Sequence, residues 1–160
     1  MHVEGDRATL VFRRLLNHPP ESVWESITNP ARLRTWFVAE AKIDGRVGGS
    51  FEMVKNPYHL HITGSILIWD PPRIFEHEWN LDPGPYHPEG ERSIVRWELR
   101  AQGGRTLLTM SHRKLSQRTA SYFVSGVQGL LDRLAAQLDG TPLPDWPSRV
   151  SEARGAYPTL

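Results

Sequence analysis

The chain has 160 residues, which suits one domain with a sizeable core and leaves little room for two. Its net charge of +1 excludes a protein that holds nucleic acid mainly through phosphates, because such proteins gather a surplus of basic residues on one face. The absence of cysteine excludes disulfides, thiolate nucleophiles and the common structural zinc sites. No apolar run reaches the roughly 20 residues that span a bilayer, and the N-terminus lacks a signal peptide's apolar stretch, so we expect an unanchored, cytoplasmic protein.

The first part of the chain predicts a strand followed by two short helices. The apolar run from Ala8 to Leu16 is rich in strand formers and too short for an independent helix. A helix start follows at Pro20, because proline fits the first helical turn and the next residue is acidic. Asn29 and Pro30 then restart a second helix, since Asn caps helices well and Pro suits the first helical position.

After these helices, short apolar runs alternate with turn residues and predict an antiparallel meander. The expected strands are residues 38–43, 48–54, 60–69, 73–81, 93–101 and 106–112. The stretch 82–91 contains three prolines and two glycines, which cannot sustain a strand ladder. We therefore predict a long loop there and treat it as a candidate lid.

A long helix is predicted over residues 119–138, where apolar residues recur at helical spacing. Gly140 and Pro142 end it. Residues 141–160 carry four prolines and little periodicity, so the expected division is one domain over residues 1–140 and a proline-rich C-terminal tail over 141–160. Trp146 and Tyr157 are expected to pin this tail to the surface.

Several motifs in this order resemble the activator of heat-shock protein 90 ATPase homologue-like family, a branch of the START-like (SRPBCC) superfamily. They are Pro20-Glu21-Ser22-Val23-Trp24, Thr28-Asn29-Pro30, Asp44-Gly45-Arg46-Val47-Gly48-Gly49-Ser50-Phe51, Ile68-Trp69-Asp70-Pro71-Pro72 and Gly103-Gly104-Arg105-Thr106-Leu107-Leu108-Thr109 with His112. The resemblance covers about residues 8–140. It implies an α+β helix-grip (START/Bet v-like) fold, in which a curved antiparallel sheet of six or seven strands wraps around the long C-terminal helix, with two short helices after the first strand.

The sequence departs from this family in the long helix, where members usually carry Gly-Trp and this chain has Gly126-Val127. If residue 127 faces the cavity, a lost indole leaves room, which is a hypothesis for a wider pocket. Gly126 and Gly129 each cost about 1 kcal/mol in a helix relative to Ala, so we expect a compensating close approach to the sheet or to a ligand.

The inner face of such a sheet, the second short helix and the stripe of the long helix supply the candidate ligand-binding residues. For any one of them core packing is the simpler interpretation, but six tryptophans in this length favour an apolar pocket. The candidates are Trp36, Phe37, Phe51, Met53, Trp69, Trp79, Trp97, Leu108, Met110, His112, Phe123, Val127, Leu130 and Leu131.

Few polar residues are candidates for metal binding or acid–base chemistry. His59 and His61 share a face of one strand, a spacing seen in metal sites, but no third ligand is fixed, so we predict no metal and no cofactor. His77, Glu78, Glu98 and His112 are the groups that could carry acid–base chemistry, although cross-strand ion pairs explain the carboxylates better and we assign no catalytic residue.

The function that these features favour is binding of a small hydrophobic or aromatic molecule in an internal cavity, as a non-catalytic carrier or sensor. One alternative is a co-regulator of a chaperone ATPase acting through protein contacts, which the resemblance implies. Another is an enzyme like the polyketide cyclases or hydratases among START-like relatives. The expected partner is therefore a small hydrophobic molecule, with a chaperone or other protein as the alternative, and the sequence leaves open whether the chain is a monomer or a homodimer.

Overall fold

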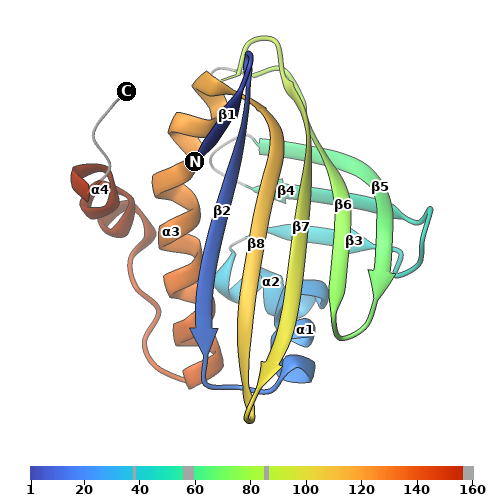
Figure 1. The fold of residues 1–160 in the computed structure, drawn as a ribbon, viewed down its shortest axis with the longest axis vertical. Coiled ribbons are helices and arrows are strands. Elements are labelled where there is room, and N and C mark those ends of the chain that lie inside the picture. The colour runs from blue at the N-terminus through green and yellow to red at the C-terminus, as the bar shows by residue number, and fades with distance from the viewer. Residues whose placement is uncertain (38, 56–59, 85–86, 157–160) are drawn as a thin grey trace.

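In a computed structural model, which describes residues 1–37, 39–55, 60–84 and 87–156, an antiparallel sheet curves around one long helix (Figure 1). The sheet has eight strands in the order β1-β2-β8-β7-β6-β5-β4-β3. The strands are β1 (His2–Glu4), β2 (Arg7–Leu16), β3 (Glu40–Ile43), β4 (Ser50–Lys55), β5 (Leu60–Asp70), β6 (Ile74–Leu81), β7 (Glu91–Gln102) and β8 (Arg105–Ser116). The helices are α1 (Pro20–Thr28), α2 (Pro30–Trp36), α3 (Gln117–Asp139) and α4 (Trp146–Ala156).

This arrangement confirms the predicted α+β helix-grip architecture. Strands from β3 to β8 pair with their chain neighbours, whereas β2 pairs with β8 and so joins the two ends of the domain. The sheet has one strand more than the six or seven expected, and the addition is the short β1 on the edge of β2. Figure 1 shows β3, β4 and β5 running across the direction of β2 and β8, so the sheet forms a concave wall behind which α1, α2 and α3 lie.

The helices begin and end at the residues whose chemistry favours it. The Asn29 side chain accepts a hydrogen bond from Ala31 N at 2.9 Å and caps α2. At the start of α3 the Ser116 hydroxyl accepts one from Thr119 N at 3.2 Å. Gly140 ends α3 with a left-handed φ of +67°, which glycine adopts without strain.

The core lies between the inner face of the sheet and the inward stripe of α3. Alternate residues on each strand face inward because successive side chains point to opposite faces. The buried inward set includes Leu10, Phe12, Phe51, Met53, Ile62, Ile66, Phe75, His77, Val95, Trp97, Leu108, Met110 and His112, and α3 adds Leu131 and Leu134.

The C-terminal segment contains a helix that the sequence did not predict. α4 packs on the side of α3 away from the sheet (Figure 1), where the guanidinium of Arg149 lies 2.8 Å from the Asp132 carboxylate. The Trp146 indole donates a hydrogen bond to the Gly126 carbonyl oxygen at 3.2 Å. A Cβ added at Gly129 would lie 3.1 Å from Trp146 Cδ1, so the close neighbour of these helical glycines is the tail indole and not the sheet or ligand we expected.

Candidate functional site

A row of inward side chains crosses the middle of the sheet. His77 on β6 pairs with Val95 on β7, and Val95 pairs with His112 on β8. The neighbouring row pairs Trp79 with Ser93. Two imidazoles, a hydroxyl and an indole are thus brought to one patch of an otherwise apolar inner face.

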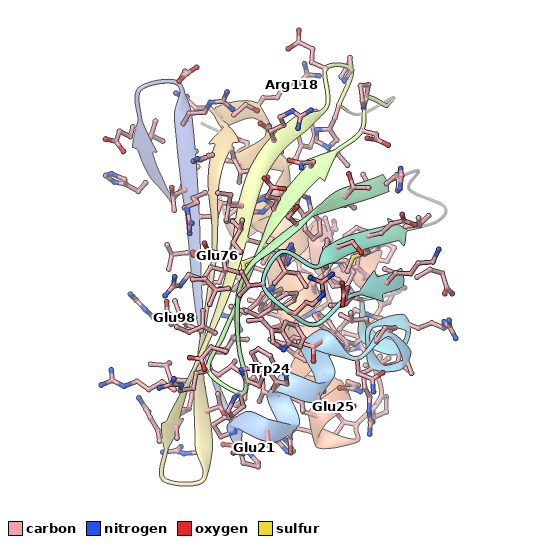
Figure 2. The ribbon with its side chains drawn as sticks, turned by 90° about the vertical axis from the view of Figure 1, so that its right-hand side faces the viewer. Glu21, Trp24, Glu25, Glu76, Glu98 and Arg118 are labelled. Carbon is pink, nitrogen blue, oxygen red and sulfur yellow. The ribbon has the colours of Figure 1, made fainter. Side chains whose placement is uncertain are left out.

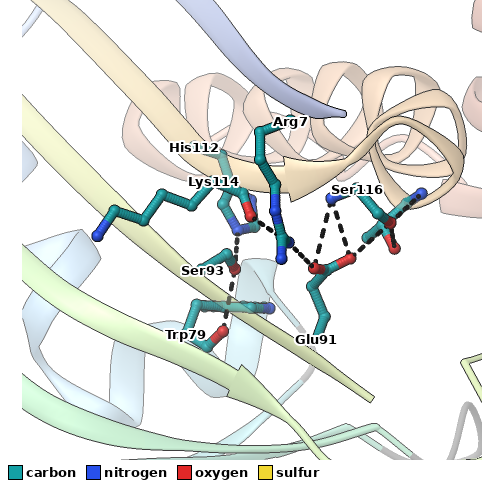
Figure 3. Close-up of polar contacts among 8 residues, drawn as sticks. Arg7, Trp79, Glu91, Ser93, His112, Lys114 and Ser116 are labelled. Carbon is teal, nitrogen blue, oxygen red and sulfur yellow. Dashed lines mark hydrogen bonds and ion pairs between the residues drawn. The ribbon is translucent and has the colours of Figure 1, made fainter. Parts of the chain in front are cut away.

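Hydrogen bonds fix the orientation of His112. Ser93 donates its one hydroxyl hydrogen to the Trp79 carbonyl oxygen at 3.0 Å (Figure 3). His112 Nε2 lies 2.8 Å from the same hydroxyl oxygen, so Nε2 must donate to it. The protonated nitrogen is therefore Nε2, and His112 Nδ1 is a hydrogen-bond acceptor.

His77 has the opposite tautomer. Its Nδ1 lies 2.9 Å from the Glu78 carbonyl oxygen, which can only accept, so Nδ1 carries the proton and Nε2 is an acceptor. The ring stacks on Phe51, with centroids 3.9 Å apart, which fixes its plane.

Both imidazoles are neutral at physiological pH. Burial lowers the pKa of His77 to about 4, and the hydrogen bond to the Glu78 carbonyl offsets only part of this. Burial likewise lowers the pKa of His112 to about 3, with a smaller contribution from His77 nearby. The patch therefore presents hydrogen-bond acceptors without charge.

Trp79 lies between the two histidines. Its ring centroid is 6.0 Å from that of His77 and 5.8 Å from that of His112. Its Nε1 is buried and has no hydrogen-bond partner among the residues that the structure describes. Although β6 is a central strand, the Trp79 side chain is only partly buried, as are Phe123, Val127 and Leu130 on the facing side of α3.

A second polar group lies where β4 ends. Lys55 is the last residue of β4 and is 3% exposed. Its Nζ lies 4.9 Å from the centroid of the Phe37 ring and 4.0 Å from that of Trp146. Burial, together with a smaller contribution from the positive charge of Arg133, lowers the pKa of Lys55 to about 8. The Phe37 ring is 6.4 Å from Trp79, so it connects Lys55 to the histidine patch.

The loop predicted as a lid reaches the start of α3. The imidazole of His87 packs edge-on against Phe123, with centroids 5.7 Å apart, and against Tyr122 at 6.4 Å. Phe123 in turn lies 5.4 Å from His112. His87 thus covers the same end of the interior as His112.

Most of the predicted ligand-binding residues lie on this interior, with two exceptions. Trp69 is at the other end of the sheet, where it packs on Trp24 of α1 at 5.1 Å and on Phe75 at 5.3 Å. Trp36 donates its indole hydrogen to the Ser26 carbonyl oxygen at 2.8 Å and is completely buried, so it supports Phe37 from behind. Ring contacts bring Phe37, Phe51, Trp79, His112 and Phe123 together at the histidine patch. The other candidates belong to the same hydrophobic core: Met53, Trp97, Leu108, Met110, Val127, Leu130 and Leu131.

The carboxylates considered for acid–base chemistry lie on the outer face. Glu98, and also Glu76, which the sequence did not single out, are on the side of the sheet away from α1 and α3 (Figure 2). Glu98 accepts a hydrogen bond from Arg96 at 3.1 Å, and Glu76 is held by Arg113 at 2.9 Å, which lowers the pKa of Glu76. Glu78 accepts from the backbone nitrogen of Ser65. Glu98 is therefore ion-paired as expected, although its partner Arg96 lies on the same strand and not across the ladder, whereas Glu78 is held by a backbone nitrogen.

Of the two histidines whose spacing suggested a metal site, His61 lies on β5 and bonds a carboxylate. His61 Nδ1 lies 2.6 Å from an Asp82 carboxylate oxygen and so joins β5 to the loop after β6. His59 falls outside the described residues, as do Val38 and Tyr157. Within residues 1–37, 39–55, 60–84 and 87–156, no cluster of three His, Cys, Asp or Glu side chains could hold a metal ion.

Two residues of the site were missed by sequence reasoning. Ser93 opens an expected strand and shares the inward parity of Trp97, a signal that was available. Lys55 continues the inward alternation of Phe51 and Met53, but a lysine at a strand end is usually solvated, so its burial could not be predicted.

Comparison with known proteins agrees with this architecture. The model of the family described as "Activator of Hsp90 ATPase homolog 1-like protein" matches residues 17–139. The crystal structure of CalU16 from Micromonospora echinospora superposes with a TM-score of 0.72 at 27% identity, covering 92% of this chain and 84% of that one. The protein MLL2253 from Mesorhizobium loti gives 0.72 at 24% identity, covering 85% and 100%, and this shows the fold alone. The sequence has no match among the curated proteins.

The described helices do not suit a membrane span. None of them combines the length and the apolar character that crossing a bilayer requires.

Proposed function

Since the chain belongs to the Activator of Hsp90 ATPase homolog 1-like protein family, we propose that its interior, between the sheet and α3, binds a small hydrophobic or aromatic molecule, and that the chain acts as a non-catalytic carrier or sensor in the cytoplasm. The observation that carries this is the buried Trp79 Nε1, a donor without a partner among the described residues. An unpaired buried donor costs about 1–3 kcal/mol. A ligand carbonyl or hydroxyl oxygen beside Trp79 would remove this cost.

Incomplete burial of facing side chains supports the same proposal. Trp79 on the sheet and Phe123, Val127 and Leu130 on α3 all pack against the hydrophobic core, yet each keeps part of its surface accessible. Protein interiors are normally packed as densely as organic crystals, so accessible surface on inward residues is expected where space for a ligand exists. The surrounding rings of Phe51 and Trp97 suit an apolar or aromatic body.

The polar groups of the patch favour a neutral ligand head with few hydrogen bonds. Trp79 offers one donor, while His77 Nε2 and His112 Nδ1 offer acceptor lone pairs. Because both imidazoles are uncharged, they orient a ligand without requiring an ionic group at this end.

Thermal unfolding with a panel of aromatic ketones, polycyclic hydrocarbons and lipids tests the proposal. A ligand at about a hundred times its Kd should raise the Tm by roughly 5–10 °C. Trp79→Phe removes the donor and keeps a smaller aromatic ring, so it should weaken binding of a ketone more than binding of a hydrocarbon. Trp69→Phe is the matched control, because that indole lies at the α1 end. If no compound shifts the Tm and native mass spectra show only unliganded protein, the proposal is wrong.

An enzyme is the second candidate, because the interior lining is not wholly apolar. Ser93, His77 and His112 give it polar groups that could move a proton. However, general bases work best with a pKa near the working pH, and those of His77 and His112 lie at about 4 and about 3. Binding therefore explains these groups better than catalysis. The family description also keeps a chaperone ATPase co-regulator as an alternative, which an ATPase stimulation assay with the full chain would test.

A further inference from the structure

The outer edge of β2 is open over the second half of the strand. β1 pairs only with residues 7–9, and the sheet order gives β2 no other neighbour on that side among the described residues. Figure 1 shows β1 beside one end of β2, with α3 running behind the rest. An unpaired strand edge presents backbone N–H and C=O groups that another extended chain can pair with. Residues 11–16 therefore form a possible template for a further strand.

A hollow of about 140 Å³ lies along this open edge. It is lined by Met1, residues 10–14 of β2, and Val124 and Gln128 of α3. The Arg14 side chain bridges the two elements, because it donates a hydrogen bond to Gln128 and lies 3.7 Å from an Asp132 carboxylate oxygen on α3. A strand added to β2 would thus lie in a groove between a strand edge and a helix, and the hollow would receive a side chain that points toward α3.

The outward residues of the open edge determine which segment would fit. Val11 and Leu15 are 46% and 45% exposed, and Arg13 lies between them on the same face, because alternate residues share a face. The Arg13 guanidinium has no ion-pair partner within the described part of the chain. Residues opposite one another in an antiparallel ladder contact each other. A complementary strand therefore has an acidic residue opposite Arg13 and an apolar residue two positions to either side.

A second copy of the chain does not meet this requirement. β2 contains no acidic residue, so pairing two β2 strands leaves Arg13 without an opposite charge. The symmetric register that sets Val11 opposite Leu15 of the second copy also sets two Arg13 side chains opposite each other, and like charges there are destabilising. Charged residues on edge strands commonly guard against such self-pairing.

We propose that the edge of β2 beside α3 is a docking site for another protein, which adds an extended segment of the pattern apolar-x-acidic-x-apolar as an antiparallel strand. β1 already pairs with the first residues of β2 in this sense, so the added strand would continue its line. The surface lies outside the interior between the sheet and α3, so this inference goes beyond the proposed function.

Three fluorescein-labelled peptides, capped at both ends, test the docking site by fluorescence anisotropy at low salt. Their cores are Val-Thr-Glu-Thr-Val, the same core with Lys in place of Glu, and the scrambled Glu-Val-Val-Thr-Thr. We expect the first to bind the wild-type chain about fivefold more tightly than either of the others. Arg13→Glu should reverse the preference between the acidic and the basic peptide. Arg92→Glu, the same charge change at an exposed position of β7, is the matched control and should change no Kd.

Amide chemical shifts of the wild-type chain locate the bound peptide. The acidic peptide should shift residues 11–16 of β2 and Val124 and Gln128 on α3, and should leave Trp79 and His112 in the interior unchanged. No binding at concentrations on the order of 1 mM, equal binding of the acidic and basic peptides, or shifts centred on the interior would each overturn the docking site. Shifts of residues 11–16 that depend on protein concentration without peptide would assign the edge to a second copy and overturn it as well. None of these results depends on ligand binding in the interior, which the thermal unfolding panel tests.

Discussion

His112 Nε2 lies 2.8 Å from the hydroxyl oxygen of Ser93, and this contact holds a neutral imidazole on the inner face of the sheet. The hydrogen bond fixes the tautomer, while burial lowers the pKa of His112 to about 3. His77, across Val95 in the same row, has its pKa lowered to about 4 for the same reason. Two buried neutral histidines make the stability of the fold depend on pH.

We expect stability to fall as the pH drops below the histidine pKa of the unfolded chain, about 6.5. Between that pH and about 4, the unfolded chain binds protons that the folded protein excludes, so each histidine lowers the free energy of unfolding by about 1.4 kcal/mol per pH unit. Above about pH 6.5 the full stability is present. His112→Gln keeps a side-chain N–H for Ser93 and removes one titrating group, so it should reduce the slope by about that amount.

Urea unfolding at a series of pH values measures this slope. His2→Gln, on the exposed strand β1, is the matched control. A slope that is the same in wild type and His112→Gln would show that His112 takes up its proton equally in the folded and unfolded chains.

The contact between Trp146 and α3 predicts different outcomes for two neighbouring glycines. A Cβ at Gly126 would lie 3.7 Å from Trp146, which is ordinary contact, so Gly126→Ala should stabilise the fold by about 0.5–1 kcal/mol through helix propensity. A Cβ at Gly129 would lie 3.1 Å from Trp146 Cδ1 and 3.4 Å from Arg149 Cβ. Gly129→Ala must displace the indole and should therefore destabilise the protein.

A double-mutant cycle identifies the cause. In a Trp146→Ala background the closest neighbour of the added Cβ is removed and Arg149 Cβ remains at 3.4 Å, so Gly129→Ala should become stabilising by up to about 1 kcal/mol. Chemical denaturation of the four proteins gives the coupling free energy. A coupling near zero would mean that α4 does not press on α3 as the structure describes.

Architecture was predictable from the sequence because each element carries its own signal. Residues at the helix ends themselves predict where helices start, at Pro20 and Asn29, and where the long helix stops, at Gly140. Alternation of apolar and polar residues predicts the strands without knowledge of which strands pair. The interior site was harder to predict, because it depends on register. The register shift between Ile66 and Ile68 turns Trp69 to the same face as Phe75, its partner across the ladder. Its predicted inward side is therefore correct, but it packs on Trp24 of α1 and not at the histidine patch.

Long-range contacts account for what the sequence did not reveal. α4 has a weak apolar pattern, and its place is set by Trp146 on the two helical glycines and by the ion pair of Arg149 with Asp132. Lys55 packs against Phe37 and Trp146, which come from elsewhere in the chain. No local pattern encodes either arrangement.

Lys114 offers a prediction about backbone strain beside the site. Its φ of +65° lies in the left-handed region, which costs an L-residue with a Cβ roughly 1–2 kcal/mol. The register between β2 and β8 shifts here. Strict alternation would put Leu115 on the same face as Arg113, but the shift turns Leu115 to the inner face, where it is buried. Lys114→Gly should therefore raise the free energy of unfolding by about 0.5–1 kcal/mol, after the entropic cost of glycine in the unfolded chain.

Denaturant unfolding of Lys114→Gly and Lys114→Ala separates the backbone effect from loss of the side chain. Lys114→Ala keeps the Cβ and the strain, so it should show no gain. A glycine variant no more stable than the alanine variant would contradict the left-handed conformation at this position.

Lys55 gives the last prediction, which concerns the cost of its burial. The folded protein holds the pKa of Lys55 at about 8, below the value of about 10.5 in an unfolded chain, so at neutral pH the buried ammonium destabilises the fold. The cation–π contacts with Phe37 and Trp146 offset part of this. Lys55→Met, with a similar length and no charge, should therefore be more stable than wild type by on the order of 1 kcal/mol at pH 7.

As the pH rises from about 8 to about 10.5 the wild type gains stability, because its folded state releases the proton first, so the advantage of the methionine variant should shrink over that range. Urea unfolding at pH 7 and at pH 10, with Lys42→Met as the exposed control, measures the difference. A methionine variant that is less stable than wild type at pH 7 would mean that the interactions of the ammonium group outweigh the cost of burying it.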